Sequence, residues 1–132
     1  MIGIDTNILL RYVIRDDPKQ TARACELMDS FSLQEPGFLT LVTLAELFWV
    51  LDRSYNESRS RILQVILAFL ANEGLRIENE LAVFDALLLY ETKPNADFSD
   101  CLIACCSMSA GCSAVYTFDR RAARSSGMTI LS

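Results

Sequence analysis

The sequence predicts an α/β fold with a mainly parallel sheet. Short β-rich segments alternate with longer segments whose apolar residues recur at helical spacing. Such alternation is typical of βα units, in which a helix connects two parallel strands. The chain has 132 residues, 52% of them hydrophobic and 22% charged, and it shows no low-complexity tract or linker. We therefore expect a single domain over residues 1–132.

In the first part of the chain, turn and cap residues separate the predicted elements. The expected strands are 2–4, 38–41 and 75–77, and the expected helices are 8–14, 18–31, 43–55 and 57–70. Pro18 suits the first position of its helix, because a proline lacks the N–H group that has no partner there. Thr43 is expected to cap the third helix, since threonine hydroxyls accept hydrogen bonds from N–H groups of the first turn.

In the second part of the chain, polar caps again precede helical segments. The expected helices are 80–90, 97–111 and 120–125, and the expected strands are 114–118 and 129–131. Asn79 and Asp97 are predicted to cap their helices, and Gly111 to end the second one. The last strand is expected at an edge of the sheet.

Composition excludes several classes of function. No apolar run reaches the ~18 residues of a membrane span, and no signal peptide is visible, so we expect a cytoplasmic protein without a membrane partner. The chain has no histidine, which excludes Ser-His-Asp, Cys-His and histidine–metal chemistry. Five cysteines, an odd number, do not form a disulfide framework. Zinc remains an alternative at Cys101 and Cys105, but buried thiols in a reducing compartment are the preferred interpretation.

Four acids occupy similar places in the predicted units, directly after a strand or about one turn into a helix: Asp5, Glu46, Asp100 and Asp119. Asp5 also suits a plain helix cap, and a solvated helix flank also accommodates Glu46. Two carboxylates 4 Å apart repel by ~4 kcal/mol at an effective dielectric near 20. Clustered oxygen ligands suit Mg²⁺ or Mn²⁺. The net charge of −5 argues against a nucleic-acid ligand unless such acids bind cations.

Five segments, IDTNILLRYV, TLAELFWVLDRSY, ADFSDCLIA, GC and TFDRRA, occur in the order seen in PIN-domain ribonucleases. The chain resembles the VapC-type toxins of bacterial toxin–antitoxin pairs over nearly its whole length. The resemblance implies a three-layer α/β/α sandwich with a mainly parallel sheet of about five strands. It also implies a metal-dependent endoribonuclease that uses one or two Mg²⁺ or Mn²⁺ ions, forms a homodimer and binds a cognate VapB-like antitoxin.

The resemblance also assigns roles to residues. It implies catalytic and metal-binding acids at Asp5, Glu46, Asp100 and Asp119, with Asp97 as a further metal ligand. Supporting polar side chains are expected at Thr6, Asn7 and Thr117. Arg120, Arg121 and Arg124 are candidates for contact with the RNA backbone, although exposed helix charges of this kind are equally compatible with simple solvation.

Three rival classes fit less well. A haloacid-dehalogenase-like phosphatase needs a second aspartate two residues after the first, where Asn7 stands. A response-regulator receiver needs a lysine at a strand end, and Lys19 and Lys93 lie in other contexts. A non-catalytic PIN scaffold that binds protein or RNA remains the alternative to the enzyme.

Overall fold

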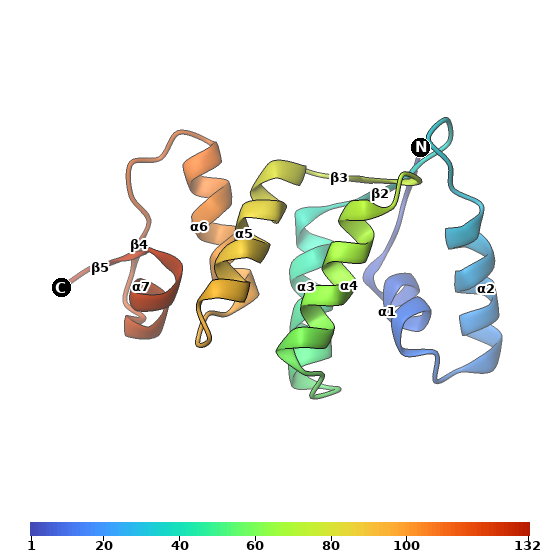
Figure 1. Cartoon of the computed structure of the whole chain (residues 1–132), viewed down its shortest axis with the longest axis horizontal. Coiled ribbons are helices and arrows are strands. Elements are labelled where there is room, and N and C mark those ends of the chain that lie inside the picture. Colours follow the sequence, from blue (N-terminus) through green and yellow to red (C-terminus); the bar gives the residue numbers. More distant parts are fainter. The chain divides into compact units, whose positions relative to one another are not determined.

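The computed structural model describes residues 1–132, which form two compact units, Met1–Glu78 and Asn79–Ser132. Figure 1 shows the helices and strands of both. The five strands of the chain all pair in parallel, three in the first unit and two in the second. The predicted α/β class with parallel pairing is confirmed. None of the seven helices combines the length and apolar character that a membrane span requires.

The first unit is built on a three-stranded sheet in the order β1-β2-β3. Its elements are β1 (Ile2–Gly3), α1 (Thr6–Ile14), α2 (Pro18–Asp29), β2 (Gly37–Leu39), α3 (Leu41–Arg53), α4 (Arg59–Ala71) and β3 (Leu75–Ile77). The central strand β2 pairs Gly37 with Ile2 on one side and with Leu75 on the other. The carboxyl ends of all three strands therefore lie along one edge of this sheet.

The helices of the first unit bury their apolar faces in one core. Helix α1 packs against α2 and α3, and α3 packs against α4 (Figure 1). The side chains that are almost fully buried include Leu9, Leu39, Leu44, Leu47, Leu51, Ile62 and Ile66. Because the buried residues of α3 and α4 recur at helical spacing, the amphipathic pattern of the sequence explains which faces of these helices turn inward.

The second unit consists of α5 (Glu80–Thr92), α6 (Phe98–Ser109), β4 (Tyr116–Thr117), α7 (Arg120–Ser126) and β5 (Thr129–Ile130). Helices α5 and α6 pack closely, and the ring of Phe98 meets the ring of Tyr90 edge-on, with centroids 5.8 Å apart. Strands β4 and β5 form a separate parallel pair. Gly127 ends α7 in the left-handed conformation, with φ of 75°, which glycine adopts without steric cost.

The predicted starts of α3 and α4 were wrong. Helix α3 begins at Leu41 and its cap is Thr40, whose hydroxyl accepts a hydrogen bond from Thr43 N–H at 3.0 Å. The predicted cap, Thr43, is instead buried in the first turn. Helix α4 begins at Arg59 rather than at residue 57, because Ser58 caps it. In both cases a hydroxyl that lies closer to the helix start satisfies the unpaired N–H groups.

Candidate functional site

Asp5 lies at the carboxyl end of β1. Ile4 extends the strand by donating its N–H to the Phe38 carbonyl at 3.1 Å, and Asp5 then caps α1. One carboxylate oxygen, Oδ1, accepts a hydrogen bond from Thr6 N–H at 2.8 Å. The side chain is exposed, and its second oxygen accepts no hydrogen bond. Asp5 thus has the helix-cap role that the sequence allowed, and one oxygen remains open to a cation.

Thr6 connects the start of α1 to Glu46 on α3. The Thr6 hydroxyl donates a hydrogen bond to Glu46 Oε1 at 2.6 Å. Glu46 is exposed, so its carboxylate is not buried without partners, and the solvated-flank interpretation describes its burial correctly. The hydrogen bond nevertheless fixes the carboxylate beside the residue that follows Asp5. Two of the predicted acids, together with the predicted supporting Thr6, therefore lie at one place in the first unit.

Glu78, directly after β3, is a strand-end acid that sequence reasoning missed. Its Oε1 accepts a hydrogen bond from Leu41 N–H at 2.9 Å, at the start of α3. Its own N–H donates to the Leu39 carbonyl at 2.9 Å, which continues the pairing of β2 and β3. The signal in the sequence was the same as for Asp5 and Asp119: an acid immediately after a short apolar strand. The Glu78 carboxylate thus satisfies one further unpaired N–H group at the start of α3, beside the cap Thr40.

The second unit brings three acids close enough to influence one another. Asp97 caps α6 by accepting a hydrogen bond from Asp100 N–H at 3.1 Å, and both carboxylates are half-buried. Burial raises the pKa of Asp100, and the charges of Asp97 and Asp119 raise it further, whereas the Arg121 guanidinium acts in the opposite direction. An ionised Asp100 is therefore disfavoured unless more positive charge is added beside it.

Asp119 follows β4 and caps α7. Its Oδ1 accepts hydrogen bonds from Arg121 N–H at 2.8 Å and from Ala122 N–H at 3.3 Å. The Thr117 hydroxyl accepts a hydrogen bond from the Asp119 N–H at 3.0 Å, so Thr117 contacts the backbone of Asp119 and not its carboxylate. Arg121 donates from Nε to the Asn95 carbonyl at 2.6 Å. Its guanidinium is thereby held beside the acids.

Substitution of Asp97 separates capping from charge. In chelator, Asp97→Ala is expected to lower the free energy of unfolding by about 0.5–2 kcal/mol, because the cap is lost. Asp97→Asn should cost much less, since asparagine caps as well as aspartate. Urea unfolding of both variants checks this difference. Equal losses in the two variants would show that the negative charge, and not the hydrogen bond, stabilises α6.

The predicted residues thus fall into two local groups. The first unit contains Asp5, Thr6 and Glu46, and the second contains Asp97, Asp100, Thr117 and Asp119. No group of three or more cysteine and carboxylate side chains is arranged to hold a metal ion. Asn7 is apart from the hydrogen bonds of both groups, because its side chain lines a groove between α1 and α2.

The cysteines do not provide an alternative site. Cys101 is buried, Cys105 and Cys106 are half-buried and Cys112 is exposed, so the prediction of buried thiols holds fully only for Cys101. Burial raises the pKa of the Cys101 thiol to about 11 and also raises that of Cys105. Because zinc binds thiolates, raised pKa values make these side chains poor ligands at neutral pH.

Comparison with known proteins supplies one match. A family model described as PIN domain matches residues 2–127. The match therefore includes every acid discussed above, from Asp5 to Asp119. Neither the comparison with curated proteins nor that with solved structures found a match.

Proposed function

The chain belongs to the PIN domain family, and on this premise we propose that it is a metal-dependent endoribonuclease that hydrolyses RNA phosphodiester bonds. PIN domains are commonly nucleases. The observation that carries the proposal is the placement of Asp97 and Asp119 near the half-buried Asp100 in a chain that has no histidine; burial, and then these two charges, raise the pKa of Asp100. Such crowding is costly without a cation and is therefore typical of carboxylates that bind one.

The proposed ligands are carboxylate oxygens, which suit Mg²⁺ or Mn²⁺ better than softer metals. They are Asp5, Glu46, Asp97, Asp100 and Asp119. One or two ions bound there would activate a water for in-line attack on phosphorus and stabilise the leaving oxygen. This chemistry requires no histidine, which agrees with the composition.

The remaining polar residues of the proposed site position these acids. The hydroxyl of Thr6 holds Glu46 in one orientation, and the hydroxyl of Thr117 fixes the backbone from which Asp119 projects. Arg120 and Arg124 are exposed and form no ion pair, so they are available for RNA phosphates. Arg121 is better assigned to the acids and to Asn95.

A cleavage assay tests the proposal. The purified protein is incubated with labelled single-stranded RNA and Mg²⁺ or Mn²⁺, and cleavage is expected with either ion and none with excess chelator. Products with 5′-phosphate and 3′-hydroxyl ends are expected, which correspond to attack by water on phosphorus with the 3′ oxygen as the leaving group. RNA that stays intact over a range of sequences and both ions would contradict the proposal.

A non-catalytic scaffold that binds protein or RNA is the second candidate. A scaffold would bind RNA or a protein without consuming it and would show no melting-temperature gain with Mn²⁺. The same assay, combined with thermal melts, distinguishes the two functions.

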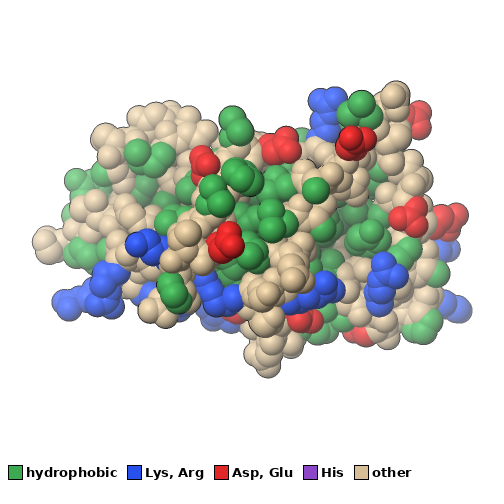
Figure 2. All heavy atoms as spheres, viewed as in Figure 1, with side chains coloured by type: hydrophobic (Ala, Val, Ile, Leu, Met, Phe, Trp, Pro, Cys, Tyr) green, Lys and Arg blue, Asp and Glu red, His purple; other side chains and the backbone are tan.

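The proposal extends to a toxin role with two protein partners. Leu33, Trp49 and Phe84 are 61%, 52% and 44% exposed, and Figure 2 shows apolar side chains on the surface of the face in view. Exposed apolar side chains of this size support a homodimer, which light scattering tests. A cognate VapB-like antitoxin is the other proposed partner, and an adjoining reading frame that encodes a small DNA-binding protein would support it.

A further inference from the structure

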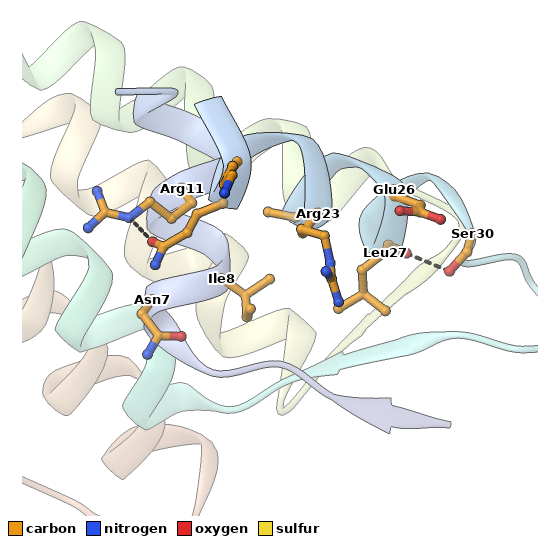
Figure 3. Close-up of a pocket in the computed structure, with 10 residues that line it drawn as sticks. Asn7, Ile8, Arg11, Arg23, Glu26, Leu27 and Ser30 are labelled. Atoms are coloured by element: carbon orange, nitrogen blue, oxygen red, sulfur yellow. Dashed lines mark hydrogen bonds between the residues drawn. The ribbon is translucent and has the colours of Figure 1, made fainter. Parts of the chain in front are cut away.

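The first unit contains an open groove between α1 and α2. Its volume is about 1020 Å³, and it begins beside Asn7, two residues after Asp5. Ile8 and Leu27 contribute apolar surface from the two helices. Figure 3 shows that Arg23 extends from α2 into the space between the helices. The groove therefore starts at the proposed site and follows the first two helices away from it.

The groove is locally basic although the chain has a net charge of −5. Its lining includes the cations Arg11, Lys19 and Arg23 and a single acid, Glu26. Arg11 is engaged already: Nη1 pairs with Asp16 at 2.7 Å, and Nε donates to Gln20 Oε1 at 2.7 Å, the bond that Figure 3 marks. This pair of contacts ties the end of α1 to the start of α2 and shapes the groove.

The two other cations are available to a ligand. Lys19 and Arg23 are exposed and have no ion pair. They are four residues apart on α2, so they lie on the same face, separated by about 6 Å along the helix. Glu26 lies farther along α2, near Ser30 in Figure 3.

We propose that this groove binds the phosphate backbone of the single-stranded RNA substrate, with Lys19 and Arg23 as phosphate contacts. The inference rests on the proposed function, because it names the path of the substrate beside the same site. Grooves that bind single strands combine basic side chains for the backbone with surfaces for sugars and bases. The lining has both: two free cations and the apolar side chains of Ile8 and Leu27.

A pair of matched double variants tests the groove. Lys19→Gln/Arg23→Gln removes both groove cations, and Arg61→Gln/Arg76→Gln removes two exposed cations of the same unit that do not line it. Each variant changes the formal net charge from −5 to −7, that is −5 − 2. Binding of a labelled oligouridylate of about ten nucleotides is measured with chelator, which prevents metal-dependent cleavage, over a range of salt concentrations.

The groove variant should bind about tenfold more weakly than wild type at low salt, and its slope of log affinity against log salt should be flatter by roughly 1.4, or ~0.7 per lost contact. The control variant should keep the wild-type slope. Lys19→Arg/Arg23→Lys, which keeps both charges, should bind as wild type does. Thermal melts establish that all variants are folded, as expected for exposed positions.

Several outcomes would overturn the inference. These are unchanged binding by the groove variant, equal losses in groove and control variants, or no binding of oligouridylate by wild type. If the groove variant binds oligouridylate normally but no longer binds a polyglutamate peptide that wild type binds, the groove is assigned to an acidic protein partner instead. Cleavage with Mn²⁺ is scored separately: cleavage with unchanged binding rejects the groove alone, whereas groove-dependent binding without cleavage rejects the ribonuclease alone.

Discussion

Asp100→Asn is expected to lower RNA cleavage by more than about 100-fold, because even a partner that only orients a metal ligand contributes 10- to 100-fold. The fold should survive. The carboxylate of Asp100 accepts no hydrogen bond, and its backbone N–H, which the substitution keeps, makes the contact with Asp97. The variant therefore removes a charge without removing a structural contact. Initial rates with Mn²⁺ measure the loss.

The stability of the same variant depends on pH and metal in a defined direction. Burial, followed by the charges of Asp97 and Asp119, raises the pKa of Asp100, so its ionised form is less favourable in the folded protein than in the unfolded chain. An acid whose pKa is raised in the folded state contributes fully to stability only below its pKa in the unfolded chain, which is about 4. This contribution is lost as the pH rises from there through the pKa of the folded state. In chelator at neutral pH, the melting temperature of Asp100→Asn should therefore equal or slightly exceed that of wild type.

Added metal reverses the order. Mn²⁺ should raise the melting temperature of wild type more than that of Asp100→Asn, because stabilisation by an ion follows its affinity for the folded state. Asp85→Asn, an exposed acid on α5 with the same charge change, is the matched control and should behave as wild type. If Asp100→Asn cleaves RNA normally and melts early with and without Mn²⁺, the residue is structural and the assignment is wrong.

Local features of the fold were predictable because short-range hydrogen bonds determine them. Asn79 and Asp97 cap their helices as predicted, each through the N–H group two residues beyond the first helical position. Thr40 replaced Thr43 because β2 ends at Leu39, two residues earlier than predicted, and the first hydroxyl after the strand reaches the helix start. Composition alone does not distinguish between two threonines three residues apart.

Long-range features were less predictable, because they depend on how elements pack. Nothing in the spacing of the sequence indicates that Thr6 donates to Glu46, forty positions later, or that Arg121 reaches Asn95. In the sequence, Lys19 and Arg23 look like the charged residues of any exposed helix. Only the packing of α1 beside α2 shows that they line a groove. The acids at strand ends were recognisable individually, whereas the contact that holds Glu46 beside Asp5 through Thr6 required the structure.

Phe98→Ala is expected to lower the free energy of unfolding by about 3–5 kcal/mol, the cost of removing a fully buried aromatic side chain. Phe98 is 0% exposed and packs edge-on against Tyr90, where it joins α6 to α5. Since domains of this size are stable by only about 5–15 kcal/mol, such a loss leaves the fold marginal. Urea unfolding measures it, and Phe98→Leu, which retains most of the volume, should lose less.

The same substitution should weaken the proposed site without touching its acids. Phe98 lies between Asp97, which caps α6, and Asp100, in the first turn. A loosened first turn spreads these carboxylates, so the gain in melting temperature with Mn²⁺ should shrink along with cleavage. Leu88→Ala on α5 is the control: its side chain is 45% exposed, and a change of less than about 1 kcal/mol is expected. If both alanine variants unfold at the wild-type urea concentration, the Phe98–Tyr90 contact does not hold α6 in place, and the acids of this unit must be positioned by other contacts.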